Sequence, residues 1–278
     1  MTLDEMQTCA AETLSYFMQT MPDVPFTGND IIIEFAKKND MAKRAKSFCA
    51  KYVPDKIINE SQTRQLNSSI AANALIGREK SAVIVRLNHK INRQKWREIL
   101  FHEFMHIFCA KTEVDGVHFM DVYGNVHTPD ENPVNEIYDG FLNAGYVVWE
   151  EFIAQYYALL KTKQHPYTFS DIADYAFGLL GEVSIAYDEK IAKDSFSMAC
   201  AYLLTCDGGN ILSNLTELDD TDLQERKTER SLRDCLEHLQ GNLQKEKPWK
   251  ISEEFISDLG SKFLMFKTMN SIDAGLLG

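Results

Sequence analysis

The sequence predicts an α+β protein that is mainly helical, with a small β-sheet in the N-terminal part and a helical C-terminal region. Two short β-branched runs, at 30–35 and 81–88, predict the strands, because such side chains pack well on a pleated surface. Apolar residues at helical spacing dominate most other segments, and beyond Pro166 no strand pattern occurs. A chain of 278 residues that is 45% hydrophobic can bury a substantial core.

The N-terminal part predicts helices on both sides of the strands. The first segment has the spacing of an amphipathic helix, with an apolar face that includes Leu3, Met6, Leu14, Phe17 and Met18. The strand at 30–35 is followed by a helix over 39–53, which has basic outer residues and ends before Pro54. Residues 55–80 are polar and give no clear pattern. After the strand at 81–88, a long helix is predicted over 93–111.

The middle of the chain changes to turn-forming residues over 112–145, where Asp-Gly, Asn-Pro and Thr-Pro-Asp follow one another. A hairpin is expected at 118–128, turning at Gly124-Asn125. Loops of this length in compact proteins usually serve a function. The helices expected after this loop are 146–163, 171–180, 182–204, 222–239 (behind a Thr221-to-Gln224 capping box) and a last one after Ser252.

Composition excludes several classes of protein. The net charge of −12 argues against nucleic acid as the main partner, and no apolar run is long enough to span a membrane. The 6 cysteines are scattered without a Cys-x-x-Cys pair, and the acidic N-terminus does not resemble a secretory signal. We therefore expect a cytoplasmic protein with reduced thiols and no membrane attachment.

The most informative motif is His102-Glu103-Phe104-Met105-His106 in the predicted helix 93–111. On a helix, residues four apart lie on the same face, so both histidines can bind one metal ion. Glu103 lies about 100° further round the helix, where it can act on a water molecule rather than bind the metal. This spacing is typical of zinc sites in metallopeptidases. The alternative is a pair of hydrogen-bonded histidines in the core of a helix that is apolar on nearly all sides.

A third ligand must come from elsewhere in the chain. The extended metzincin pattern is excluded, because Cys109 and Thr112 occupy the positions of its glycine and third histidine. The other residues that remain possible are Glu113, His118, Asp121, His127, Glu150 and Glu151.

Glu150 and Glu151 are the better candidates, because they lie on a second helix with apolar surroundings. The helix face of Glu151 continues with Ala154, Gln155 and Ala158. These small residues permit close approach, and Gln155 could hydrogen-bond to a ligand. The face of Glu150 continues instead with bulkier residues. The face argument therefore favours Glu151 as the third ligand.

The residues around these positions resemble a known family. Gluzincin metallopeptidases combine His-Glu-x-x-His on one helix with a glutamate on a later one. The segments AVIVRLNHKINRQKWREILFHEFMHIF and EEFIAQYYALL are similar, more narrowly, to the ImmA/IrrE-like peptidases. The resemblance implies a zincin-like fold whose small sheet packs on the His-Glu-x-x-His helix and binds an extended peptide at its edge. It also implies that His102, His106 and Glu151 bind Zn²⁺ and that Glu103 activates water.

Motif and resemblance together predict a zinc metallopeptidase that acts on a peptide or protein substrate. Its catalytic core would span 1–165, and a helical subdomain would span 166–278. The residues considered for stabilising the oxyanion are His118, Tyr123, His127, Tyr146 and Tyr157. The main alternative is a zincin-like protein without activity, in which zinc is structural and the chain serves as a regulatory or binding partner.

Overall fold

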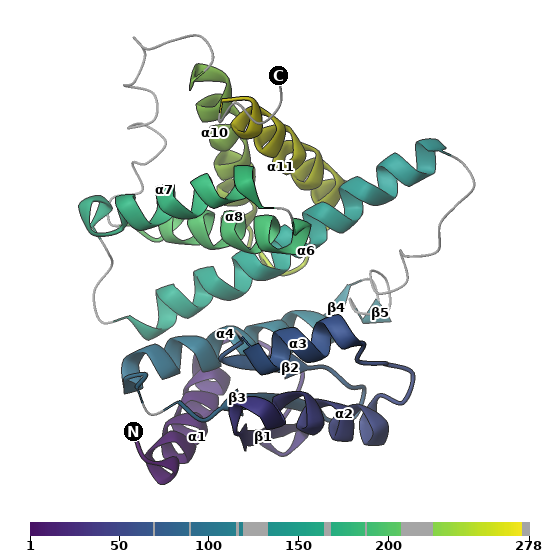
Figure 1. The fold of residues 1–278 in the computed structure, drawn as a ribbon, viewed down its shortest axis with the longest axis vertical. Helices are drawn as coiled ribbons and strands as arrows, with labels where there is room; N and C mark the ends of the chain where they lie inside the picture. Colours follow the sequence, from purple (N-terminus) through teal and green to yellow (C-terminus); the bar gives the residue numbers. More distant parts are fainter. Residues whose placement is uncertain are drawn as a thin grey trace. The chain divides into compact units, whose positions relative to one another are not determined.

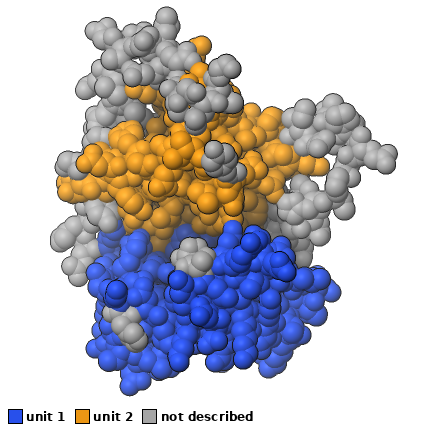
Figure 2. All heavy atoms as spheres, viewed as in Figure 1, with its two compact units in different colours: residues 1–112, 161–163 blue, residues 113–160, 164–278 orange. Residues whose placement is uncertain are grey.

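The computed structural model describes residues 1–68, 70–88, 90–114, 117–118, 133–163, 168–186, 188–206 and 225–273. The chain forms two compact units: residues 1–112 with 161–163, and residues 113–160 with 164–278 (Figure 2). The predicted α+β class is confirmed, since the protein is mainly helical with a small mixed sheet in the N-terminal part. Among the described residues, no helix is long and apolar enough to cross a bilayer. The predicted division into domains 1–165 and 166–278 stays a prediction.

Unit 1 is built around a three-stranded sheet with the order β1-β3-β2 (Figure 1). β3 pairs in parallel with β1 and antiparallel with β2, so that β2 is an edge strand. Its main elements are α1 (Leu3–Thr20), β1 (Ile31–Ala36), α2 (Met41–Tyr52), α3 (Glu60–Ser68), β2 (Ala72–Leu75), β3 (Ser81–Arg86) and α4 (Arg93–Lys111).

The two faces of this sheet are covered by different helices. Successive side chains of a strand point to opposite faces, so Ala82 and Ile84 of β3 share one face. Both belong to a buried cluster with Phe48 and other residues of α2, and with Leu66 of α3. Helix α4 contacts β2 and β3 on the opposite face, and α1 packs on α4. The long predicted helix is therefore a central, buried element of unit 1.

Local sequence explains where these helices begin and how they pack. Thr2 and Glu5 form a capping box at the start of α1, with the Glu5 amide donating to Thr2 Oγ1 at 3.2 Å. Asn92 caps α4 by accepting a hydrogen bond from the Lys95 amide at 2.8 Å. The ring of Phe17 contacts Phe101 and Phe104, with ring centroids 4.8 Å and 5.9 Å apart. Aromatic contacts of this kind fix α1 against α4.

Unit 2 consists mainly of helices (Figure 1). Helices α7 and α8 pack against each other, as do α10 and α11. The ring of Phe196 in α8 contacts Phe263 and Phe266 in α11, at centroid distances of 5.1 Å and 5.0 Å. The elements are β4 (Glu113–Val114), β5 (Val117–His118), α6 (Pro133–Thr162, of which the last two residues belong to unit 1), α7 (Phe169–Ile185), α8 (Glu189–Leu204), α10 (Glu225–Leu243) and α11 (Glu253–Asp273).

Two glycines allow α6 and α11 to approach each other at backbone distance. A Cβ atom added at Gly145 would lie 1.9 Å from the Ile256 carbonyl oxygen. A Cβ atom added at Gly260 would lie 1.9 Å from the Phe141 carbonyl oxygen. No other residue type fits at these positions without separating the helices.

Helix α6 begins earlier than the sequence predicted. We expected a loop up to residue 145, whereas the helix starts at Pro133. Proline is favoured in the first turn of a helix, where its missing N–H is not needed. Gly140 and Gly145, which indicated a loop, lie within the helix. Most of the expected hairpin at 118–128 and the Thr221 capping box lie outside the described residues.

His238 of α10 links two helices and gives a pH-dependent prediction. Its ring stacks on Phe255 of α11 at 4.4 Å, and its Nδ1 lies 3.2 Å from Asp258 Oδ2. Burial lowers the pKa of His238 and outweighs the opposite effects of the Phe255 carbonyl and Asp258. Folding therefore favours the neutral ring. The contribution of His238 to the free energy of unfolding is complete above about pH 6.5, the pKa of histidine in the unfolded chain.

We expect this contribution to be lost as the pH falls below about 6.5 towards the lower folded pKa. The measurement is the free energy of unfolding by urea between neutral and mildly acidic pH. The wild type should lose more stability over this range than His238→Gln, which has no titrating ring. Equal losses in the two proteins would contradict the assignment.

Candidate metal centre

The histidine pair is held by the buried helix α4. His102 and His106 lie one turn apart, with ring centroids 4.6 Å apart and ring planes at 80°. Their Nε2 atoms are 2.9 Å apart. Two unprotonated ring nitrogens repel each other at this distance. One of them must therefore carry a hydrogen, or a cation must lie against both.

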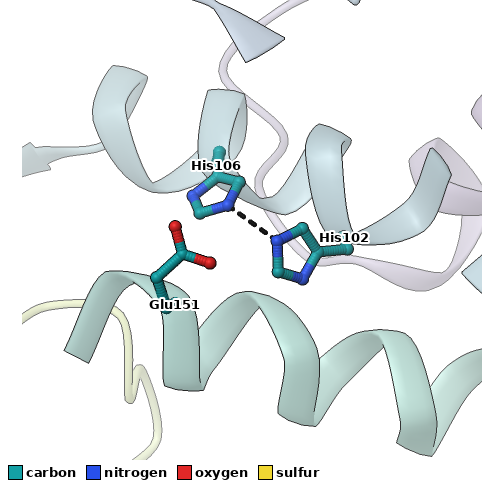
Figure 3. Close-up of side chains that lie close together, drawn as sticks. All are labelled: His102, His106 and Glu151. Atoms are coloured by element: carbon teal, nitrogen blue, oxygen red, sulfur yellow. Dashed lines mark hydrogen bonds between the residues drawn. The ribbon is translucent and has the colours of Figure 1, made fainter. Parts of the chain in front are cut away.

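Glu151 of α6 completes a group that could hold a metal ion. One ligand atom from each of His102, His106 and Glu151 lies within 4.8 Å of the others. Figure 3 shows the Glu151 carboxylate pointing towards the two imidazole rings. His106 is buried, and the other two are half-buried. Among the residues that the structure describes, this is the only such group of three or more His, Cys, Asp or Glu side chains.

Glu103 is held at the edge of the sheet. Its carboxylate accepts a hydrogen bond from the Ala74 amide of β2, at 2.6 Å to Oε2. Only 8% of the Glu103 residue surface is exposed, so this bond helps to satisfy a carboxylate that has little access to water. The residue that the sequence predicts as general base therefore lies beside an edge strand, one position after His102.

The register of β2 explains why the Ala74 amide is available. In an antiparallel pair, residues alternate between those that bond to the neighbouring strand and those whose N–H and C=O point away from it. The Arg86 amide donates to the Ala71 carbonyl, which makes 71 and 86 a bonded pair. Ala72 and Ala74 then direct their backbone groups outward, away from β3. Their small side chains also allow α4 to lie close to the strand.

Lys190 of α8 is a charged residue near Glu151 that the sequence analysis did not single out. Its ammonium group lies 2.7 Å from Asp194 Oδ2. Burial lowers the pKa of Lys190, but the negative charges of Asp194, Glu151 and Glu150 raise it overall. Both glutamates that were considered as the third ligand therefore lie in the field of this lysine.

Among the described residues, no further His, Cys, Asp or Glu side chain joins this group. Glu150 is half-buried, and its neighbour Glu151 is the one that meets the histidines. The ring of Tyr157 contacts Trp249, with ring centroids 6.2 Å apart, and its part in stabilising the oxyanion stays a prediction. Gln155 is buried one turn after Glu151. The side chains of Glu113 and His118, and all of Asp121, Tyr123 and His127, lie outside the described part of the chain.

Comparisons of the chain with protein-family models, with curated proteins and with solved structures found no match. The resemblance to the ImmA/IrrE-like peptidases therefore stays a prediction from the motifs. The structure supports a coarser statement. The protein has an α+β fold with a His-His-Glu group on helices that is consistent with a His-Glu-x-x-His metal site.

Proposed function

We propose that this protein is a zinc-dependent peptidase in which His102, His106 and Glu151 bind the metal and Glu103 is the general base. The observation that carries the proposal is the convergence of these three ligand groups from α4 and α6. Two imidazoles and one carboxylate are the ligand set of many catalytic zinc sites, which keep a further position for water or substrate.

The spacing of the ligand atoms fits zinc. Two ring nitrogens bound to one tetrahedral zinc ion lie about 3.4 Å apart, because each Zn–N bond is about 2.1 Å. The Nε2 atoms are 2.9 Å apart, and the three groups lie within 4.8 Å of one another. A small shift of either ring is enough to reach the expected spacing. Structural zinc sites almost always have four protein ligands, whereas the described residues supply three here.

Zinc at this site would polarise the scissile carbonyl and make water more acidic. The chain's own contribution to the reaction is the Glu103 carboxylate. It would accept a proton from the attacking water and deliver it to the nitrogen of the leaving amine. The bond from the Ala74 amide to Oε2 holds the carboxylate in one orientation. This leaves Oε1 as the oxygen that exchanges the proton.

A peptide substrate is supported by the position of Glu103 beside the edge of β2. The outward backbone groups of Ala72 and the carbonyl group of Ala74, whose amide is bonded to Glu103, can pair with an extended peptide, as an added strand pairs with a sheet edge. Such pairing would bring a peptide bond close to Glu103. Recognition through the backbone leaves the preferred side chains of the substrate open.

The first test is the zinc content of the purified wild type, of Glu151→Gln and of Glu150→Gln. We expect close to one zinc ion per chain in the wild type, and a zinc affinity at least about 100-fold weaker in Glu151→Gln, since one ligand of three is lost. Inductively coupled plasma mass spectrometry gives the content, and competition with a chelator gives the affinity.

Glu150→Gln is the matched control, because it makes the same change at the neighbouring position and should retain zinc. Unchanged zinc in Glu151→Gln would show that another residue is the third ligand. No zinc in the wild type, even after the metal is added, would make His102 and His106 a hydrogen-bonded pair in the core.

A further inference from the structure

One short segment of unit 1 carries an excess of positive charge. Residues 37–56 contain 7 Lys and Arg against 2 Asp and Glu, whereas the rest of the chain contains 22 against 39. The net charge of −12 therefore conceals a local excess of the opposite sign. Four of these basic residues lie on α2 (Lys43, Arg44, Lys46 and Lys51), and three lie just outside its ends (Lys37, Lys38 and Lys56). We call the seven the basic surface of α2.

The basic surface of α2 is exposed to solvent. All seven residues are exposed, whereas the opposite side of the helix is buried in the cluster that contains Phe48 and Ile84. Along the middle of the exposed side lie Ser47 and Ala50, which are also exposed. Small residues between long basic ones leave room for the backbone of a partner to approach the helix.

Little within unit 1 neutralises these charges. In the part of the chain that the structure describes, Arg44 alone among the seven has an ion-pair partner, Glu34, at 3.6 Å. The Lys51 ammonium lies over the ring of Tyr52, 4.8 Å from its centroid. Like charges along one helix face repel one another, so an anionic partner would relieve this repulsion.

The chemistry of the surface favours an acidic protein segment over nucleic acid. The two aromatic residues of the segment, Phe48 and Tyr52, are buried and half-buried, so no ring is presented for stacking on bases. Ile57 follows Lys56 with 83% of its surface exposed and offers an apolar contact to a protein partner.

We propose that the basic surface of α2 is a docking site for an acidic, flexible segment of a partner protein that also carries an apolar residue. The site is separate from the metal centre, because α2 and α4 cover opposite faces of the sheet. Docking therefore does not depend on the proposed peptidase activity. If the protein is a peptidase, this surface would recruit its substrates by a segment remote from the cleaved bond.

The test is binding of a fluorescein-labelled synthetic peptide of glutamate and aspartate with one leucine, measured by fluorescence anisotropy with the full chain. We expect the wild type to bind the peptide, with an affinity that falls as salt is added. The charge reversal Lys43→Glu, Lys46→Glu and Lys51→Glu should weaken binding at least about tenfold, because each substitution replaces an attraction with a repulsion.

The control reverses three exposed lysines outside this surface: Lys90→Glu, Lys227→Glu and Lys250→Glu. It changes the net charge equally and should bind the peptide nearly as well as the wild type. Circular dichroism shows whether both triple variants are folded. Ile57→Ser leaves the charge unaltered and should also bind the peptide more weakly than the wild type. Equal weakening in the two triple variants would overturn the proposal. Tighter binding of a duplex oligonucleotide than of the peptide would also overturn it.

Discussion

Glu103→Gln should keep its zinc and lose its hydrolytic activity. Glutamine has nearly the same shape and can still accept the hydrogen bond from the Ala74 amide, so the fold and the ligand set should be unchanged. It cannot take a proton from water, and removal of a general base typically lowers the rate by about 10²–10⁴-fold. The measurement is cleavage of a peptide library by the wild type, followed by the rate of the variant on each peptide that is cleaved.

Glu98→Gln is the matched control for this substitution. Glu98 lies on the same helix, is 5% exposed and pairs with Lys95 at 2.6 Å, so it is an equally buried carboxylate that is not in the ligand group. We expect Glu98→Gln to retain activity. Activity retained in Glu103→Gln would exclude Glu103 as the base. A wild type that binds zinc but cleaves no peptide would instead favour a non-catalytic protein.

The core of the candidate site could be predicted because its geometry is local. The spacing of His102 and His106 in one helix fixes them on the same face, whatever the rest of the fold does. Glu151 was favoured over Glu150 by the small residues on its face, and Glu151 is the one that meets the histidines. The bond from Ala74 to Glu103 was not predicted, because it depends on the pairing of β2 with β3. Strand pairing is set by contacts that are distant in sequence.

The elements that escaped prediction have weak local signals. β2 is four residues long, and Ala-Asn-Ala-Leu contains no β-branched or aromatic residue. Its place in the sheet comes from burial of Ala72 and Leu75, which only the tertiary fold decides. The basic surface of α2 was visible in the sequence as basic outer residues of a helix. Its significance depends on knowing that no described acidic residue other than Glu34 forms an ion pair with it.

Gly145 and Gly260 show how the same residue type can mislead a prediction and yet determine a fold. In the sequence, glycine at 140 and 145 indicated a loop, since glycine weakens helices. In the structure both lie in α6, and Gly145 is needed because the backbone of α11 occupies the place of its side chain. At Gly140, by contrast, a Cβ atom would have nothing within 4 Å, so the helix gains nothing from glycine there.

We therefore expect Gly145→Ala and Gly260→Ala each to lower the free energy of unfolding by about 3 kcal/mol or more, at the upper end of overpacking costs. Each new methyl group would lie 1.9 Å from a carbonyl oxygen, which cannot move aside as a flexible side chain can. Gly140→Ala, in the same helix, should instead stabilise the protein by roughly 0.5–1 kcal/mol. Urea unfolding curves of the three variants measure these differences.

The two destabilising substitutions should not add. Both glycines lie at one crossing, since a Cβ atom at either position would also lie 2.8 Å from the amide nitrogen of the other. Once the first alanine has forced the helices apart, the second meets more space, so the double variant should be more stable than the sum of the single effects implies. Full additivity would mean that the two contacts are independent.

Because Gly145 and Glu151 share α6, we also expect Gly145→Ala to weaken zinc binding, whereas Gly140→Ala should leave it intact.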